Sequence, residues 1–298
     1  MKQAASFRGV YALLLTPFEA DGRIDWQAYD RYVDWQLEAR TNGLFAVCGS
    51  SEMAFLEPDE RLALAKRAVG RAGSVPVVAT ANVGPDPAAH REELLRMAET
   101  GVSGVVLVVP QGLGADTERL EAYFAGLAAA SPVPALLYEW PHWKPKDIDP
   151  AMYGRLVQQA GIIGVKDTTC TMAGIQAKIA AAAESVVYQA NTPLLLEALR
   201  SGAGGVMSTV STVAAKLLQR MWAEEEAGSG LAERAHERLV LLDGVLGPEF
   251  TASGKYMAAR QGAPMTTTTR SGKQVSEARA KALDVWLSYA ATELGEEA

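Results

Sequence analysis

The stretch Gly161–Asp167, with the sequence GIIGVKD, decides the fold that this chain is expected to adopt. A short run of β-branched residues bounded by glycine is typical of a strand buried in a parallel sheet. This strand ends on Lys166, and a charged ammonium is costly to bury unless it is paired. We therefore expect the strand to bring Lys166 to a cleft at its C-terminal end. The alternative is a lysine that reaches solvent from the strand end or pairs with Asp167.

The rest of the chain repeats the alternation of a short apolar strand with a helix. Besides the strand that carries Lys166, strands are expected at residues 10–15, 44–47, 75–81, 104–109, 134–138, 185–189 and 204–208. Helices are expected at residues 25–39, 58–70, 87–100, 117–130, 150–159, 172–184 and 193–200. Eight strands that alternate with helices predict an α/β fold, the (β/α)8 or TIM barrel.

The C-terminal part of the chain has a different pattern. Short apolar runs typical of strands do not occur after about residue 225, and helices are expected at 231–246, 255–260 and 276–294. The run Gly228-Ser229-Gly230 is a plausible boundary. We therefore expect a barrel with the active site over residues 1–228 and a C-terminal helical domain over 229–298.

Composition excludes several classes of function. Of the 298 residues, 49% are hydrophobic and 21% charged, as in an ordinary globular protein, and the net charge of −7 argues against a nucleic-acid surface. The sequence has no run of about 18 apolar residues and no apolar signal region, so neither a membrane span nor a signal peptide is expected. The two cysteines, Cys48 and Cys170, indicate no disulfide framework and favour a cytoplasmic location.

Cofactor motifs are also absent from the sequence. The three histidines, His90, His142 and His236, are scattered and have no carboxylate cluster at ligand spacing, so no metal site is expected. The sequence contains no G-x-G-x-x-G motif and no P-loop, so no nucleotide cofactor is expected either.

Polar residues stand where the predicted strands end, which is where this fold builds active sites. They are Thr16, Gly49, Ser50, Ser51, Asn82, Tyr138, Lys166, Asn191 and Ser208, with Met207 at the end of the eighth strand. A set of largely uncharged side chains around a single lysine suits carbonyl chemistry better than phosphoryl transfer. The lysine would then attack a carbonyl carbon and form a Schiff base.

Two strand ends supply candidate partners for Lys166. The turn Gly49-Ser50-Ser51 offers backbone N–H groups and two hydroxyls that fit a small carboxylate, although it could be an ordinary serine-rich turn. Tyr138 could pass a proton through its phenol, or it could be a strand-end tyrosine with a buried ring and a solvated hydroxyl.

Taken together, these residues resemble the dihydrodipicolinate synthase and N-acetylneuraminate lyase family over nearly the whole chain. The matching blocks are Thr16-Pro17-Phe18, Gly49-Ser50-Ser51-Glu52 in place of G-[ST]-[ST]-G-E, Tyr138-x-x-Pro141, and Ile163-Gly164-Val165-Lys166-Asp167. The spacing between the blocks fits as well.

The resemblance implies Lys166 as the Schiff-base lysine, Tyr138 as the proton relay aided by Ser50, and Gly49, Ser50 and Ser51 as the binding site for the carboxylate of pyruvate or another 2-keto acid. It also implies a homotetramer built from dimers and no metal or organic cofactor. The expected reaction is reversible C3–C4 cleavage of a keto acid or condensation with an aldehyde. The alternatives are dehydration of a 2-keto-3-deoxy acid by the same Schiff base, an authentic dihydrodipicolinate synthase, and, last, a barrel without catalysis.

The chain departs from the family pattern where the second substrate would bind. Pro110 is not followed by a tyrosine, Glu139 replaces an asparagine, and Asn191 stands where an aspartate is usual. Trp143 stands where dihydrodipicolinate synthases have an arginine for a second carboxylate. We take Glu139, Trp143, Asn191 and Met207 as candidate substrate-binding residues. Without the guanidinium, we expect aspartate semialdehyde to be a poor acceptor and neutral aldehydes to be better ones.

Overall fold

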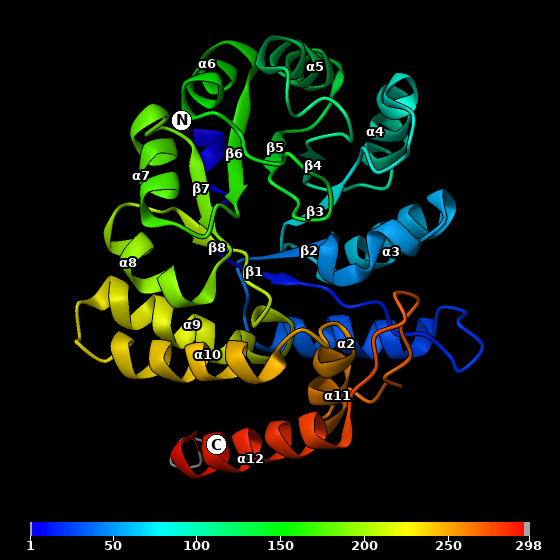
Figure 1. Ribbon diagram of the computed structural model, residues 1–298, viewed down its shortest axis with the longest axis vertical. Helices are drawn as coiled ribbons and strands as arrows, with labels where there is room; N and C mark the ends of the chain where they lie inside the picture. Colours follow the sequence, from blue (N-terminus) through cyan, green and yellow to red (C-terminus); the bar gives the residue numbers. More distant parts are fainter. Residues whose placement is uncertain (1, 295–298) are drawn as a thin grey trace.

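The chain forms a closed barrel of parallel strands, seen end-on in Figure 1 in the computed structural model, which describes residues 2–294. Within those residues the strands are β1 (Gly9–Leu13), β2 (Gly43–Val47), β3 (Val77–Thr80), β4 (Gly104–Val108), β5 (Ala135–Tyr138), β6 (Ile162–Asp167), β7 (Val186–Gln189) and β8 (Gly205–Val206). Each strand pairs with the next, and β8 closes on β1. The predicted TIM barrel is confirmed.

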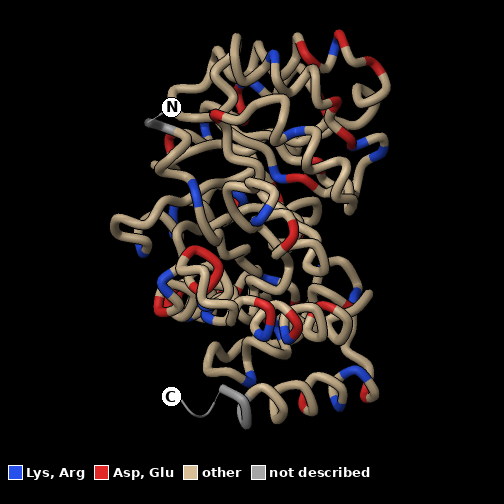
Figure 2. The backbone as a smooth tube through the Cα atoms, turned by 90° about the vertical axis from the view of Figure 1, so that its left-hand side faces the viewer, with Lys and Arg blue, Asp and Glu red and all other residues tan. Residues whose placement is uncertain are grey.

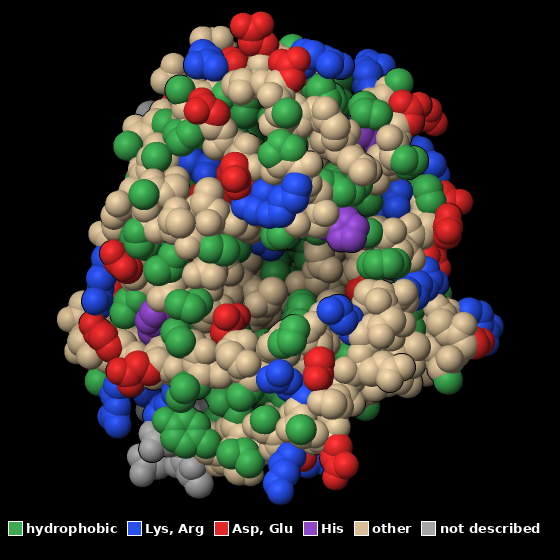
Figure 3. Space-filling model, in the orientation of Figure 1, with side chains coloured by type: hydrophobic (Ala, Val, Ile, Leu, Met, Phe, Trp, Pro, Cys, Tyr) green, Lys and Arg blue, Asp and Glu red, His purple; other side chains and the backbone are tan. Residues whose placement is uncertain are grey.

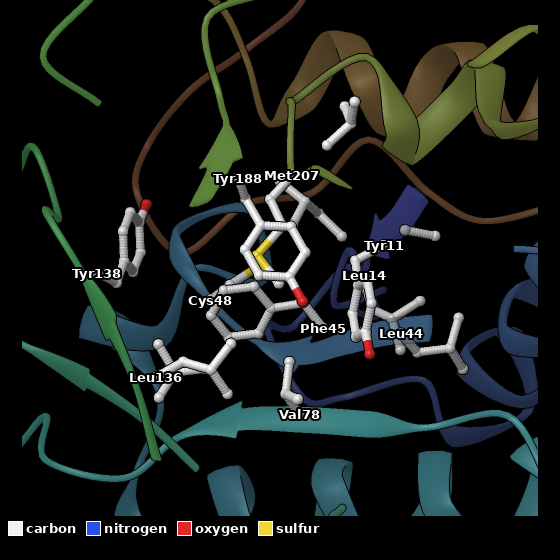
Figure 4. Close-up of a cluster of buried hydrophobic side chains, with 14 of the residues drawn as sticks. Tyr11, Leu14, Leu44, Phe45, Cys48, Val78, Leu136, Tyr138, Tyr188 and Met207 are labelled. Carbon is white, nitrogen blue, oxygen red and sulfur yellow. The ribbon is translucent and has the colours of Figure 1, made fainter. Parts of the chain in front are cut away.

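Large side chains fill the inside of the barrel, as Figure 4 shows. The rings of Tyr11 and Tyr188 meet edge to face with their centroids 5.4 Å apart. They fit because Gly43 and Gly205 face them: a Cβ at Gly43 would lie 2.2 Å from the Tyr11 ring, and one at Gly205 would lie 2.7 Å from the Tyr188 ring. The Tyr188 hydroxyl donates to the backbone oxygen of Phe7, just before β1. This packing closes the N-terminal end of the barrel and leaves the opposite end for a site.

Helices surround the barrel. They are α2 (Trp26–Glu38), α3 (Pro58–Ala72), α4 (His90–Ala98), α5 (Thr117–Ala130), α6 (Pro150–Ala160), α7 (Met172–Ala181), α8 (Leu195–Arg200) and α9 (Ser211–Ala227), with a short α1 (Lys2–Ala5) before β1. Side-chain caps fix where several begin: Asp25 accepts from the N–H of Ala28 and Asp116 from that of Arg119.

Short 3₁₀ turns occupy the loops that follow three of the strands. They are η1 (Gly49–Ser51) and η2 (Met53–Phe55) after β2, η3 (Pro87–Ala89) after β3, and η4 (Thr192–Leu194) after β7. The turn η1 places the Gly49-Ser50-Ser51 stretch directly at the end of β2.

Three further helices follow the barrel: α10 (Ala232–Leu246), α11 (Ala252–Arg260) and α12 (Glu277–Leu294). Figure 1 shows α10 beside α9, α12 as the outermost layer, and the segment between α11 and α12 returning toward α2 and α3. Buried residues of all three helices, among them Leu239, Met257 and Leu283, belong to the same hydrophobic core as the barrel. The division of the chain into domains at residue 228 stays a prediction.

The outer surface carries both signs of charge. Figure 2 shows Lys and Arg interspersed with Asp and Glu along the surrounding helices. Several of these charges pair between neighbouring helices, as Arg155 of α6 does with Glu121 of α5 at 2.7 Å. No helix within residues 2–294 is long and apolar enough to cross a membrane.

Candidate active site

The two main candidate residues lie side by side at the end of the barrel that faces α11. Tyr138 is the last residue of β5 and Lys166 the fifth of β6, and the strand register pairs them directly. The Lys166 Nζ lies 4.4 Å from the centroid of the Tyr138 ring and 5.5 Å from that of Phe45. In Figure 4 the Tyr138 hydroxyl points opposite to those of Tyr11 and Tyr188. The phenol therefore faces the open end of the barrel, and Lys166 lines the same cavity there.

A cavity of about 490 Å³ lies over this pair. Figure 3 shows the hollow in the middle of the face seen in Figure 1. Lys166, Tyr138, Gly49 and Ser50 form part of its lining. Apolar walls come from other elements, with Met53, Phe55, Trp140, Pro141 and Phe250. This volume suits a small-molecule substrate.

Burial dominates the chemistry of Lys166. The side chain is 5% exposed and has no carboxylate or hydrogen-bond partner among the described residues. Burial disfavours the ammonium and lowers the pKa of Lys166 from its usual 10.5 to about 8. About a tenth of the amine is therefore neutral at pH 7, far more than for an ordinary lysine, and the neutral form is the nucleophile.

Tyr138 remains a phenol at neutral pH. It is 4% exposed, and burial, with a smaller effect from Cys48, raises the pKa of its hydroxyl well above the usual 10. Its hydroxyl has no hydrogen-bond partner within residues 2–294, and a Cβ at Gly49 would lie 3.3 Å from it. The glycine thus leaves room for the phenol, which is free to donate to a ligand in the cavity.

The two serines of the turn η1 have different surroundings. The Ser51 hydroxyl lies 2.7 Å from the backbone oxygen of Leu14 and accepts from the N–H of Cys48 at 3.1 Å, so it holds the turn against β1 and β2. The Ser50 hydroxyl has no such partner among the described residues, and Ser50 lines the cavity. The geometry thus places Gly49 and Ser50 at the cavity, whereas Ser51 supports them from behind.

Four other candidates lie outside the cavity lining. Met207 is buried inside the barrel, where Figure 4 shows it near Tyr188. Asn191 is half-buried at the start of η4. Trp143 is half-buried and packs edge to face on Trp140, with the ring centroids 4.7 Å apart. Glu139 is completely buried on the outer side of β5.

Glu139 belongs to a buried ionic cluster behind the active site. Its carboxylate lies 2.8 Å from the Nζ of Lys178 and accepts from the N–H groups of Ile148 and Thr168, each at 2.9 Å. Lys178 also donates to Asp167 at 2.7 Å. Burial, which dominates over the nearby lysine, raises the pKa of Glu139. Since Glu139 follows Tyr138 and Asp167 follows Lys166, the cluster holds the two strand ends that carry the candidate residues from outside.

The sequence prediction missed several residues of the cavity wall. Trp140 lines the cavity and stacks on His142 with the ring centroids 4.9 Å apart. It lies just beyond β5, in a turn where its N–H donates to the backbone oxygen of Tyr138 at 3.0 Å, so strand alternation does not predict its position. Thr251, Ser271 and Lys273 also line the cavity, and no local pattern in the sequence indicates this.

The residues described form no metal-binding group. Within residues 2–294, no three His, Cys, Asp or Glu side chains come together in a way that could hold a metal ion. The free cysteines are Cys48, buried at the end of β2, and Cys170, exposed after β6.

Comparison with known proteins gives one consistent result. The family model of the dihydrodipicolinate synthetase family matches residues 6–285. A 4-hydroxy-tetrahydrodipicolinate synthase from Pseudomonas savastanoi pv. phaseolicola is 30% identical over 242 residues, 80% of this chain and 82% of the relative. One from Saccharophagus degradans is 32% identical over 231 residues, 76% of this chain and 78% of the relative.

Solved structures agree on the fold. A prophage protein of the dihydrodipicolinic acid synthase family from E. coli K12, in complex with pyruvate, superposes with a TM-score of 0.89 at 24% identity, over 95% of this chain and 98% of that one. A dihydrodipicolinate synthase from Bacillus anthracis has a TM-score of 0.88 at 24% identity, with the same coverage.

Fold, cavity and relatives together define a class I lyase, an enzyme that acts on small molecules through a Schiff base with pyruvate or a similar keto acid. The chain belongs to the dihydrodipicolinate synthetase family.

Proposed function

We propose that Lys166 forms the Schiff base and that the enzyme reversibly joins a 2-keto acid to an aldehyde. The observation that carries this proposal is a buried lysine at the floor of a cavity, with a pKa lowered to about 8 and no carboxylate partner among the described residues. The carboxylate of the keto acid would bind at Gly49 and Ser50, next to Lys166.

The reaction begins with attack of the neutral Lys166 amine on C2 of the keto acid. The resulting carbinolamine loses water and becomes a protonated Schiff base, whose cationic nitrogen accepts electrons from the adjacent carbon. Loss of a C3 proton gives an enamine, which attacks the aldehyde carbon and forms the C3–C4 bond while the aldehyde oxygen takes up a proton. Water then hydrolyses the Schiff base and releases the product and free Lys166. Tyr138, aided by the Ser50 hydroxyl, would carry the protons.

Borohydride trapping tests the proposal directly. Reduction in the presence of pyruvate should add a stable mass to a peptide containing Lys166. Lys166→Ala should abolish both the adduct and turnover, whereas Lys66→Ala, at an exposed site on α3, should keep both. An adduct that persists in Lys166→Ala would remove the central claim.

The same intermediate allows a second outcome, dehydration of a 2-keto-3-deoxy acid by expulsion of hydroxide. The curated relatives carry a third activity in their name, 4-hydroxy-tetrahydrodipicolinate synthesis. Product analysis with pyruvate and a panel of aldehydes, compared with 2-keto-3-deoxy acids alone, separates these reactions. We infer the aldol reaction because the cavity has room for a second substrate beyond Lys166.

We also infer that the enzyme works in the cytoplasm as a homotetramer. Large hydrophobic side chains are exposed on the outer helices, among them Leu241 of α10 and Val285 of α12, which are 54% and 62% exposed. Such side chains are suited to burial between subunits. Sedimentation equilibrium would give the mass, and a monomer at micromolar concentration would contradict the inference.

A further inference from the structure

A second cavity lies outside the active site, among the helices α2, α9 and α12 and the end of α11. Its volume is about 270 Å³, and none of the residues that line it lines the cavity over Lys166. In Figure 1 these helices lie in the lower half of the view. We propose that this cavity binds a flat aromatic molecule of about two fused rings that carries a carboxylate, and that the bound molecule regulates the enzyme by holding the start of α9.

The walls of this cavity are mostly apolar and include two tryptophans. Trp286 of α12 is 7% exposed, and the ring of Trp35 of α2 stacks on that of Tyr32 with the centroids 6.0 Å apart, so both aromatic walls are held in place. A preformed apolar cavity with aromatic walls favours a flat aromatic ligand over water. The other apolar residues of the lining are Ala39, Val213, Ala214, Ala215, Leu217, Leu287 and Ala290.

The volume of the cavity sets the size of the ligand. An apolar cavity of roughly 150 Å³ stays free of water and accepts benzene, which has a single ring. The cavity between α2, α9 and α12 has a volume of about 270 Å³, which suits two fused rings. A flexible acyl chain of the same volume would lose more conformational entropy on binding than a rigid ring system.

Two polar side chains in the lining define the rest of the ligand. Lys216 is exposed, and its ammonium forms no ion pair with any described residue, so it favours a carboxylate where the ligand reaches solvent. The amide nitrogen of Gln261 donates to the backbone oxygens of Val213 at 3.1 Å and Met257 at 3.2 Å. The amide oxygen of Gln261 accepts no hydrogen bond from the residues that the structure describes, and it can accept one from a ring N–H.

The cavity borders the start of α9, where the helix is interrupted. Residues 213–215 line the cavity, and among them Ala214 has the non-helical backbone angles φ −138° and ψ 38°. The hydroxyl of Thr212 donates to the backbone oxygen of Thr209 at 2.7 Å, and Thr209 lines the cavity over Lys166. A ligand stabilises the conformation that forms its cavity, so this ligand should also stabilise the position of Thr209 in the wall of the active site.

Isothermal titration calorimetry of the full chain, without substrate, tests the class of ligand. Indole-3-acetate should bind saturably with a submillimolar Kd. Indole-3-acetamide lacks the charge and naphthalene-1-acetate lacks the ring N–H, so each should bind roughly threefold more weakly. Octanoate, an anion with a flexible chain, should bind roughly tenfold more weakly. Because no substrate is present, these measurements do not depend on the proposed function.

Variants that fill the cavity locate the binding site. Ala290 of α12 and Ala39 at the end of α2 line the cavity from different helices. Ala290→Phe and Ala39→Phe each put a ring into the cavity, and because the ring and the ligand cannot occupy the same volume, each should abolish saturable binding. Circular dichroism shows whether the variants are folded, and either variant alone suffices if the other fails to fold.

The charge of the ligand is tested at Lys216. Lys216→Met should lower the affinity for indole-3-acetate by roughly threefold, the usual effect of an exposed ion pair, and should leave that for indole-3-acetamide unchanged. Lys281→Met, at an exposed site on α12 outside the cavity lining, serves as the matched control and should change neither affinity.

Regulation is measured in the condensation of pyruvate with an aldehyde. Saturating indole-3-acetate should lower KM by roughly fivefold. Ala290→Phe should keep the basal activity and lose this response. A rise in KM that persists in both cavity-filling variants would show that the acid competes at the active site instead, and would overturn the regulatory role.

Two results would overturn the binding site itself. One is the absence of saturable binding to the wild type, which a second copy of the chain covering the cavity would produce; the other is binding that both cavity-filling variants retain. Octanoate that binds as tightly as indole-3-acetate would reject the aromatic class of ligand, and saturable binding without any change in KM would reject regulation.

Discussion

The environment of Lys166 differs from that of every other buried lysine in the described residues. Lys146 donates to Asp147 at 2.6 Å, Lys178 contacts two carboxylates and Lys255 pairs with Glu52. Lys166 instead lies over the rings of Tyr138 and Phe45. A carboxylate would stabilise the ammonium and raise the pKa of the lysine. Aromatic rings instead exclude water and attract the cation only weakly, so the neutral amine is favoured. Under the proposed function, the absence of an ion pair is what allows this lysine to act as the nucleophile.

The lowered pKa of Lys166 predicts how the rate depends on pH. Below about pH 8 the amine is mostly protonated, so kcat/KM for pyruvate should rise with pH and level off above about 8. The rate of borohydride trapping, measured between pH 6 and 9.5 under pseudo-first-order conditions, checks this. A rate that still rises tenfold per pH unit at pH 9.5 would show that burial does not depress the pKa of this lysine.

Removal of the Tyr138 hydroxyl should slow the reaction more than it weakens binding. The phenol has no other partner in the described residues and faces the cavity, so its proton is available to the substrate. Tyr138→Phe should lower kcat by roughly two to four orders of magnitude, the usual effect of a positioned acid or base. Single-turnover kinetics and a pyruvate titration would separate the two effects. A phenylalanine variant with the wild-type kcat would make Tyr138 part of the wall only.

At the scale of the element, strand alternation explains where the structure places the candidate site residues. Tyr138 and Lys166 end neighbouring parallel strands, so their meeting follows from the barrel topology. The residue after each points the opposite way, so Asp167 at the end of β6 and Glu139 just beyond β5 both contact Lys178 of α7 outside the barrel. The sequence contained this information for Glu139, but the departure from the family pattern made that residue a candidate for substrate binding instead.

The cluster behind these strands predicts a strong effect on stability. Lys178 of α7 bridges Glu139 and Asp167, and all three side chains are buried. Lys178→Met would leave two carboxylates facing each other without a cation, which should reduce the free energy of unfolding by about 3–5 kcal/mol. Urea denaturation measures the loss. The double variant Lys178→Met/Glu139→Gln should recover part of it, because one buried charge is removed as well.

At the scale of the whole molecule, the sequence predicted the barrel and the strand ends at the floor of the cavity, but not the outer half of the cavity. Short apolar strands and capped helices are local signals, and the chain repeats them eight times. The return of the segment before α12 to the barrel depends on contacts between distant residues, such as the pair Glu52 and Lys255. No local pattern encodes such a pair. The second-substrate side of the cavity therefore could not be derived from the strand ends.

The pair of Glu52 and Lys255 ties the C-terminal segment to the barrel. Lys255 is completely buried on α11, and its Nζ donates to Glu52 at 2.7 Å and to the backbone oxygen of Thr268 at 2.6 Å. Glu52 in turn accepts from the N–H of Ser271 at 2.9 Å. Lys255 thus connects the loop after β2 with Thr268, and Glu52 binds Ser271, so the pair anchors the middle of the segment between α11 and α12.

Lys255→Met should therefore affect stability and substrate binding together. The substitution leaves the buried Glu52 carboxylate without its cation, so the free energy of unfolding should fall by about 3–5 kcal/mol. Because Glu52 and Thr268 lose their common donor, the segment should loosen, and KM for the aldehyde should rise while trapping of pyruvate on Lys166 persists. Glu52→Gln/Lys255→Met should restore much of the stability, since neither charge is left unpaired, but not the aldehyde KM, since the link to Thr268 is still missing. Equal recovery of both quantities in the double variant would show that the pair contributes to folding alone and that the wall does not depend on it.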